Sequence, residues 1–260
     1  MPRPSTHPQS LGTLRPHRSG RCAWVSGVGA VALMCIASAS RAEAQGSTVV
    51  HPSPFIAHKA ESLLREQLPC LGCHAFGDEG GRLAPDLRTV RERRSAAYIA
   101  AMIDAPQRTA PGSLMPRTLM LPATRDAIVS YLQSLPGDGN VAGATAGAAS
   151  AGAASAPAAS TDGAALYAAW CAGCHGVRGK GDGPNARFLP VRPAAHADAA
   201  TMRERPDDAL YDTIAGGGAI MNRSARMPAF GATLSDPQIR ALVAYIRTLC
   251  ACTGPSWSTR

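Results

Sequence analysis

Aromatic residues are scarce in this 260-residue chain, since Phe, Tyr and Trp together make up only 5% of it. The length allows one large domain or two small ones. Two domains of about a hundred residues each would be hard to fill with so few large rings. The composition therefore predicts that something other than protein side chains supplies flat, apolar bulk to the cores.

Two sequence patterns are also missing, and each absence excludes a class of protein. We find no run that alternates apolar and polar residues as a strand does, so we expect an all-α fold. We find no Lys- and Arg-rich run with interleaved aromatics, so nucleic-acid binding has little support. RERR at 91–94 is interpreted as a solvated loop.

The N-terminus has the order of a secretory signal. Residues 1–21 contain four Arg and no acid, AWVSGVGAVALMCIA at 23–37 is apolar, and small residues follow up to Ala42-Glu43-Ala44. The apolar run is too short and too glycine-rich to span a bilayer comfortably. We therefore predict a signal peptide at 1–44, with a retained membrane anchor as the alternative.

Export would place the protein in an oxidising compartment, and we predict a periplasmic location with, at most, peripheral contact with a membrane. Removing residues 1–44 takes away five Arg and one Glu, which lowers the net charge from +8 to +4. Most of the apparent basicity therefore belongs to the predicted signal.

A low-complexity segment divides the rest of the chain. Residues 136–160 read PGDGNVAGATAGAASAGAASAPAAS, with one charge and nothing larger than Val. Such a composition is typical of a flexible linker. We predict an Ala/Gly/Ser linker at 137–160 between domains at 50–136 and 161–252, followed by a C-terminal tail at 253–260.

The two halves repeat the same order of elements. Each opens with a helix that leads into a Cys-x-x-Cys-His motif, has a middle helix and a Met-Pro loop, and closes with an amphipathic helix. Tyr131 and Tyr245 take like places in the closing helices, and we expect both to pack against the opening helix. The predicted helices are 55–68, 95–104 and 124–135 in the first half, and 161–170, 206–216 and 235–249 in the second.

The repeated motif reads CLGCH at 70–74 and CAGCH at 171–175. Two such pairs could bind zinc, but zinc pairs are normally separated by a short loop rather than by a hundred residues. A thiol–disulfide switch usually sits at a strand-to-helix turn, which this sequence lacks. Covalent haem attachment explains both thiols and the adjacent His in each copy, because the thiols add to two vinyl groups and the imidazole reaches the iron.

With these motifs, with SLMP at 113–116 and with ARMPAF at 225–230, the chain resembles the class I c-type cytochromes, in a two-domain dihaem arrangement. The resemblance implies an all-α fold of two cytochrome c-like domains and two covalently bound haem c groups. The residues that it assigns to thioether attachment are Cys70, Cys73, Cys171 and Cys174, and those that it assigns as proximal iron ligands are His74 and His175.

The family's distal ligand is a Met in the loop before the last helix, and a thioether raises the potential of the iron. Met227 fits this place in the second domain, with Met221 and His196 as alternatives. In the first domain Met115 precedes a Pro, and Met120 is the alternative, beside an open or His-ligated site.

For two further pairs of residues the sequence leaves two interpretations open. Pro85 and Pro193 either offer a carbonyl to the proximal His, as the family's loops do, or are simple turn prolines. Cys250 and Cys252 follow the last helix and form either a local disulfide or free thiols, with a redox or intermolecular role as the alternative.

Six-coordinate irons would leave no place for a substrate, so the first functional hypothesis is single-electron transfer. The protein would link a dehydrogenase or a quinol-oxidising complex to a terminal acceptor such as an oxidase. The alternative is a dihaem enzyme, a peroxidase or a sulfur-compound dehydrogenase, with an open or unusual distal site in domain one.

Overall fold

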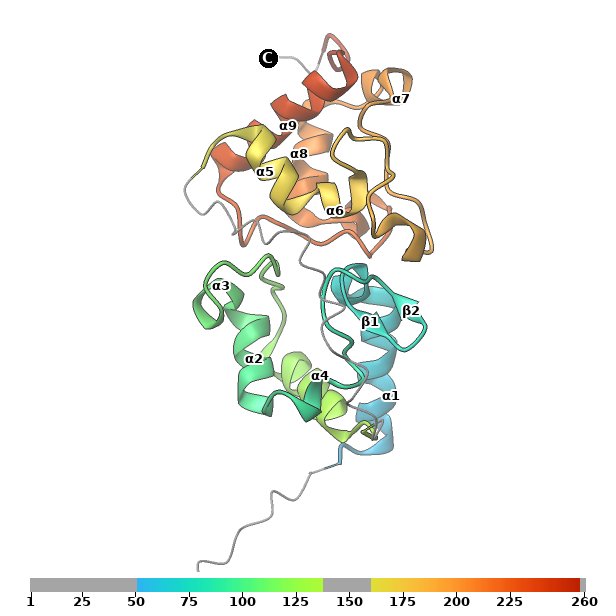
Figure 1. Ribbon diagram of the computed structural model, residues 1–260, viewed down its shortest axis with the longest axis vertical. Helices are drawn as coiled ribbons and strands as arrows, with labels where there is room; N and C mark the ends of the chain where they lie inside the picture. Colours follow the sequence, from blue (N-terminus) through green and yellow to red (C-terminus); the bar gives the residue numbers. More distant parts are fainter. Residues whose placement is uncertain (1–50, 138–159, 258–260) are drawn as a thin grey trace, which may run out of the picture. The chain divides into compact units, whose positions relative to one another are not determined.

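The computed structural model describes residues 51–137 and 160–257 (Figure 1). Their secondary structure is almost entirely helical, which confirms the predicted all-α class. The described residues belong to one compact unit, and within it the buried apolar residues gather in two separate cores, one in each half of the sequence. The predicted signal, nearly all of the predicted linker and the last residues of the predicted tail lie outside the described residues.

The described part of the first half contains the helices α1 (Pro54–Ser62), α2 (Ala96–Asp104), α3 (Pro106–Thr109) and α4 (Pro122–Ser134). A π-helical turn, Leu63–Gln67, extends α1 up to the first motif, so the predicted helix at 55–68 is confirmed. Ser95 caps α2, because its hydroxyl accepts a hydrogen bond from the Tyr98 N–H at 3.2 Å.

Helix α4 packs against α1 and α2 and closes the core of the first half. Tyr131 of α4 is buried, its ring stacks on that of Phe76 at 6.3 Å, and its hydroxyl interacts with Glu61 of α1. The expected packing of Tyr131 on the opening helix is therefore confirmed. Burial, followed by the Glu61 charge, raises the pKa of Tyr131 to about 12.

The described part of the second half contains α5 (Gly163–Trp170), α6 (Ala172–His175), α7 (Ala199–Arg203), α8 (Asp207–Gly216) and α9 (Asp236–Cys250). Asp162 caps α5 through a 2.9 Å bond from the Ala164 N–H, and Ser235 and Gln238 form a capping box at the start of α9. These local signals explain why the predicted boundaries of both helices hold.

Helices α5 and α9 pack closely and carry the core of the second half. A Cβ on Gly163 would overlap the Ala241 carbonyl oxygen, so the residue must be glycine for the helices to approach so closely. Tyr245 of α9 lies with its ring centroid 5.3 Å from that of Tyr167 on α5, which confirms the expected contact with the opening helix.

A short hairpin was not predicted, and neither were the short helices α3 and α7. The strands β1 (Ala75–Phe76) and β2 (Glu79–Gly80) pair antiparallel directly after the first motif, with Ala75 opposite Gly80. Gly77 turns the chain between them with φ of 68°, a conformation that glycine adopts without strain. A two-residue ladder is too short to produce an alternating pattern, so no sequence signal marks it.

Short 3₁₀ turns at Pro69–Gly72, Val90–Glu92, Ala186–Phe188 and Gly218–Met221 complete the regular structure. Across the described ranges, no helix has the length and apolar character needed to cross a bilayer.

Candidate functional site

The first motif follows α1 and occupies the 3₁₀ turn at Pro69–Gly72 and the residues after it. Cys70 and Cys73 are not disulfide-bonded and lie among buried groups. Burial raises the pKa of Cys70 to about 11 and that of Cys73 to about 12, and the Cys174 thiol adds to the effect on Cys73. Both thiols are therefore neutral at ordinary pH.

The imidazole of His74 is fixed by one hydrogen bond. Its Nδ1 lies 2.7 Å from the Pro85 carbonyl oxygen, and this carbonyl is the partner predicted from the sequence. A carbonyl can only accept, so Nδ1 carries the proton and Nε2 keeps its lone pair. Burial lowers the pKa of His74, which favours the neutral imidazole that a metal requires.

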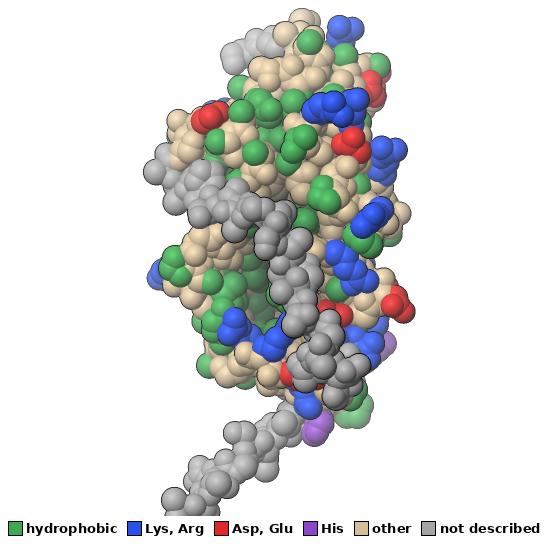
Figure 2. All heavy atoms as spheres, in the orientation of Figure 1, with side chains coloured by type: hydrophobic (Ala, Val, Ile, Leu, Met, Phe, Trp, Pro, Cys, Tyr) green, Lys and Arg blue, Asp and Glu red, His purple; other side chains and the backbone are tan. Residues whose placement is uncertain are grey.

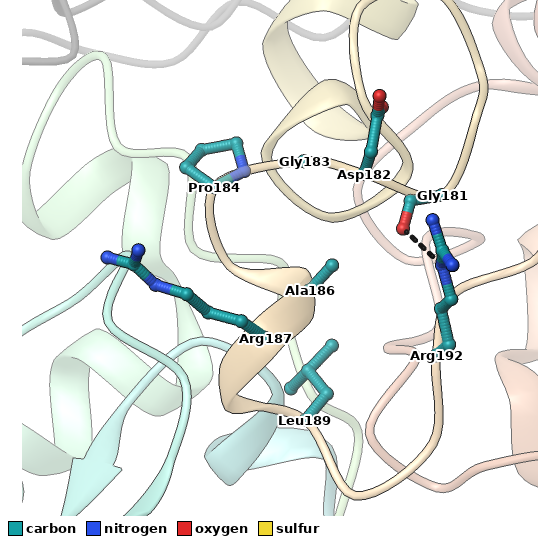
Figure 3. Close-up of a pocket in the computed structure, with 8 residues that line it drawn as sticks. All are labelled: Gly181, Asp182, Gly183, Pro184, Ala186, Arg187, Leu189 and Arg192. Carbon is teal, nitrogen blue, oxygen red and sulfur yellow. Dashed lines mark hydrogen bonds between the residues drawn. The ribbon is translucent and has the colours of Figure 1, made fainter.

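The second motif occupies α6, directly after α5. Gly176 ends α6 with φ of 79°, and Gly179 and Gly181 also have positive φ. The chain therefore leaves the second motif through a glycine-rich turn. Figure 3 shows a hollow along its exit, where Arg192 donates from Nε to the Gly181 carbonyl at 3.3 Å and so holds the loop together.

His175 has the same arrangement as His74, with one difference in register. Its Nδ1 lies 2.9 Å from the carbonyl oxygen of Ala194. The expectation that Pro193 supplies this carbonyl was wrong by one residue, because the Pro193 carbonyl instead lies against the glycine-rich turn, where a Cβ on Gly181 would overlap it. Burial lowers the pKa of His175, so this imidazole is neutral too.

Both Met-Pro loops lie beside the core of their own half. Met227 packs against the second core, its carbonyl accepts from the Gly218 N–H at 3.0 Å, and a Cβ on Gly218 would lie 3.2 Å from its Cβ. Met115 and Met120 both pack against the first core. Of the two, Met115 has its peptide fixed on both sides, by the Ser113 hydroxyl at 3.2 Å and the Gln107 amide at 2.8 Å.

The structure excludes His196 as the alternative distal ligand. Its ring stacks on that of His175, with centroids 4.2 Å apart and planes 14° apart. Two axial imidazoles point end-on at an iron between them and do not stack face to face. In addition, His196 Nδ1 lies 3.0 Å from the Tyr167 hydroxyl. Met221, the other predicted alternative to Met227, has an exposed side chain.

The donor set fits a haem better than it fits a bare metal ion. Within the described ranges, no group of three or more His, Cys, Asp or Glu side chains is placed to hold a metal ion, so the zinc interpretation has no site there. The described residues include one buried side-chain nitrogen without a partner, Nε1 of Trp170, directly before Cys171. An unpaired buried donor at that place fits a site completed by a group that is not protein.

Two family models match the chain. The model described as "Cytochrome c" matches residues 64–136, and the model described as "Cytochrome C oxidase, cbb3-type, subunit III" matches residues 158–246. The chain belongs to the class I c-type cytochromes and has two haem-binding domains. The cytochrome therefore binds haem c covalently, as the motifs indicated.

The cytochrome is also similar to two other proteins. Over 132 residues it is 29% identical to a subunit of nicotinate dehydrogenase from Pseudomonas putida; this match covers 50% of the chain and 10% of the dehydrogenase subunit, so the chain spans about a tenth of its relative's length. It also matches a chain of the reducing HAO-like protein complex of Kuenenia stuttgartiensis, at 22% identity and a TM-score of 0.29. That match covers 69% of this chain and 79% of the other.

Two polar residues near the motifs have places that the sequence did not predict. For His196 only a distal-ligand role was predicted, and for Asn185, buried at 1% exposure, no role was predicted. The Asn185 side chain reaches the Cys174 sulfur at 3.3 Å. An Asn directly after Gly-Pro would ordinarily indicate only a turn, so the sequence held no signal for its burial.

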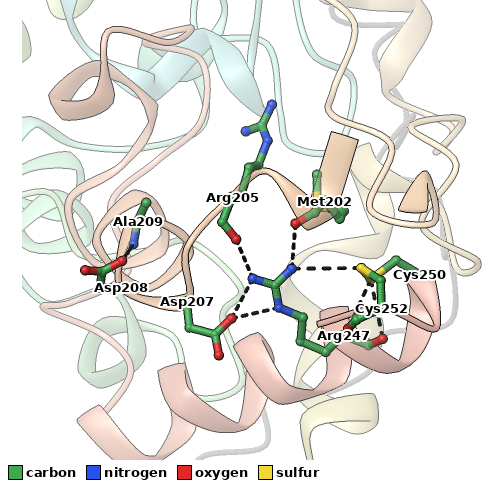
Figure 4. A network of polar contacts seen from close by, with 8 residues as sticks. All are labelled: Met202, Arg205, Asp207, Asp208, Ala209, Arg247, Cys250 and Cys252. Atoms are coloured by element: carbon green, nitrogen blue, oxygen red, sulfur yellow. Dashed lines mark hydrogen bonds and ion pairs between the residues drawn. A yellow bond between two sulfur atoms is a disulfide. The ribbon is translucent and has the colours of Figure 1, made fainter. Parts of the chain in front are cut away.

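Cys250 and Cys252 form a disulfide, with 5.1 Å between their Cα atoms, so the predicted local disulfide is confirmed. It lies beside a network centred on Arg247, which Figure 4 shows. This guanidinium donates to the Met202 and Arg205 carbonyls at 2.7 and 2.5 Å and pairs with Asp207. The network joins the end of α9 to α7, to the start of α8 and to the turn between them.

Proposed function

We propose that the cytochrome carries two haem c groups and transfers single electrons between a dehydrogenase or quinol-oxidising complex and a terminal acceptor. The observation that carries the proposal is the paired geometry at His74 and His175. Each imidazole has its Nδ1 hydrogen-bonded to a backbone carbonyl, which leaves Nε2 available to bind an iron. Each histidine directly follows two cysteines that are not disulfide-bonded.

In this proposal Cys70, Cys73, Cys171 and Cys174 add their S–H groups across the vinyl bonds of the two haems. Met115 and Met227 supply the distal sulfurs, and the Pro85 and Ala194 carbonyls hold the proximal rings. Haem c supplies one-electron chemistry when it is bound. The protein excludes water, fixes the ligands and thereby keeps the reorganisation on electron transfer small.

The proposed partners are redox proteins. The likeness to a dehydrogenase subunit over half of the chain supports a dehydrogenase as the donor. Over the face drawn in Figure 2, Lys and Arg side chains prevail, with Asp and Glu side chains among them, which favours small, transient and salt-sensitive contacts. We propose a periplasmic location on the strength of the leader-like residues 1–44.

The test is the mass and spectrum of the mature protein made with a competent maturation system. We expect the mass of the polypeptide plus two haems, low-spin iron in both domains and no turnover of peroxide. A high-spin signal from domain one together with peroxide turnover would replace the carrier by the dihaem-enzyme alternative. A colourless protein with the mass of the polypeptide alone would overturn both.

A further inference from the structure

The buried side chain of Asn185 joins the two haem-attachment motifs. Its Nδ2 donates to the Gly72 carbonyl of CLGCH at 2.7 Å, and its Oδ1 accepts from the Arg82 N–H at 2.7 Å. Its own backbone N–H donates to the Gly173 carbonyl of CAGCH at 3.0 Å. One residue is therefore hydrogen-bonded to the peptide between the cysteines of both motifs.

Asn suits this place because it offers a donor and an acceptor at once. Gly72 presents a carbonyl, which needs a donor, and Arg82 presents an N–H, which needs an acceptor. Asp would lack the donor and Leu would lack both. Because the contact is buried, each group left unpaired costs about 1–3 kcal/mol.

Glycines let the two motifs come close. A Cβ on Gly72 would overlap the carbonyl oxygen of Arg226, which is next to Met227 in the chain. A Cβ on Gly173 would lie 2.9 Å from a methyl group of Leu83, and one on Gly81 would lie 2.8 Å from both amide atoms of Asn185. The glycine within each motif is thus the point where the other half of the protein makes contact.

The cysteines confirm that the motifs are neighbours. Cys73 and Cys174 are the second thiol of each motif, and Asn185 touches the sulfur of Cys174 while it bonds to the residue before Cys73. A further hydrogen bond between the halves, from the Arg117 N–H to the Thr233 hydroxyl at 2.8 Å, lies outside the motifs. The halves are therefore held at more than one point, although the predicted linker alone would leave them free.

We propose that Asn185 clamps the two haem-attachment segments together so that the two haems exchange electrons directly within one molecule. The proposal rests on the proposed function, since it needs a haem at each motif. Electron tunnelling falls exponentially with the distance between donor and acceptor. The clamp holds the segments of Cys73 and Cys174 together, and these two thiols would form one thioether of each haem. If each motif carries a haem c, the exchange would move one electron from the reduced haem of one domain to the oxidised haem of the other, with no further reactant.

The experiment measures electron exchange in the full-length holoprotein after rapid reduction by less than one electron per molecule. The wild type is expected to relax with a rate that does not depend on protein concentration. Asn185→Asp, which keeps the shape but lacks the donor, is expected to slow this phase at least tenfold. Gly81→Ala, whose methyl group would overlap both the Gly72 carbonyl oxygen and the Asn185 amide that bonds to it, is expected to have the same effect. The control is Asn222→Asp, an exposed Asn of the same half, which should leave the rate unchanged.

The outcomes separate the clamp from the proposed function. Two haems per chain with an exchange rate that scales with concentration in the wild type would overturn the direct exchange and leave the carrier intact. Two haems with a wild-type rate in both Asn185→Asp and Gly81→Ala would overturn the role of Asn185. Fewer than two haems in the wild type would remove the proposed function first, and the exchange with it.

Discussion

The ring of His196 stacks on the ring of His175, with centroids 4.2 Å apart and planes within 14° of parallel. The Tyr167 hydroxyl is hydrogen-bonded to Nδ1 of His196 at 3.0 Å, and the Ala194 carbonyl is hydrogen-bonded to Nδ1 of His175. The predicted proximal ligand of domain two is therefore restrained both in tilt and in rotation. No ring contact of this kind is made by His74 within the described residues.

We predict that His196 positions the imidazole plane of His175. His196→Phe keeps a stacked ring, whereas His196→Leu removes it. We expect the low-spin electron paramagnetic resonance signal of the domain-two iron to change in the Leu variant and to stay close to wild type in the Phe variant. The domain-one signal serves as the internal control. Equal signals in all three proteins would show that the stack does not set the ring orientation.

The same pair of variants carries a stability prediction. Both leave the buried Tyr167 hydroxyl without its partner, so each should lose about 1–3 kcal/mol of unfolding free energy. Denaturant titration of the holoprotein measures the loss. A Tyr167→Phe variant is expected to recover part of it when combined with His196→Phe, because the unpaired hydroxyl is then gone as well.

The distal ligands can be identified by removing one sulfur at a time. We expect Met227→Ala to abolish one of two far-red methionine–iron charge-transfer bands of the oxidised protein, and Met115→Ala to abolish the other. Each loss should lower the potential of one haem, because thioether sulfur favours ferrous iron. Met120→Ala is the matched control, since Met120 packs against the same core as Met115. Loss of the band in Met120→Ala instead would reassign the ligand of domain one.

Local signals explain which parts of the molecule the sequence could predict. The capping residues Ser95, Asp162 and Ser235 form hydrogen bonds with residues two or three positions away, so the sequence predicts where these helices begin. The Cys-x-x-Cys-His motifs are equally local. The haem-attachment chemistry was therefore predictable without knowledge of the fold.

Contacts over long separations explain what the sequence could not predict. Asn185 meets Gly72 across 113 positions, and His196 meets Tyr167 across 29, so neither pairing leaves a pattern in the chain. The carbonyl that holds His175 comes from Ala194 rather than Pro193, because the turn of a loop decides which of two adjacent carbonyls points inward. Such registers are set by packing and not by residue type.

Stability should fall at alkaline pH because two tyrosines are buried. Burial raises the pKa of Tyr131 to about 12 and raises that of Tyr167 as well. The folded state keeps these protons while the unfolded chain releases them near the ordinary tyrosine pKa of about 10. The stabilisation is therefore complete below pH of about 10 and is lost as pH rises through about 12.

Replacing the hydroxyls tests this dependence. Tyr131→Phe should flatten the loss of unfolding free energy between pH of about 10 and 12, by no more than about 2.5 kcal/mol. Tyr98→Phe, on the surface of α2, is the control for losing a hydroxyl. Unfolding curves collected across this range measure the slope, and a slope unchanged in Tyr131→Phe would contradict the assignment.

Two arginines on α9 give a matched test of buried against exposed ion pairs. Arg247 is 12% exposed, pairs with Asp207 and donates to two backbone carbonyls, whereas Arg240 is 70% exposed and pairs only with Asp236 and the neighbouring Tyr211 ring. Arg247→Leu leaves the Arg205 carbonyl and the Asp207 carboxylate without the guanidinium donor, while the Met202 carbonyl keeps its bond from the Arg205 N–H. We expect a loss of about 1–3 kcal/mol of unfolding free energy, because the Arg205 carbonyl loses its donor, whereas Asp207 is 40% exposed and can be hydrated. Arg240→Leu should cost much less, because its ion pair is exposed and screened by solvent. Denaturant titration of both holoproteins decides the matter, and equal losses would mean that the network in Figure 4 does not anchor the end of α9.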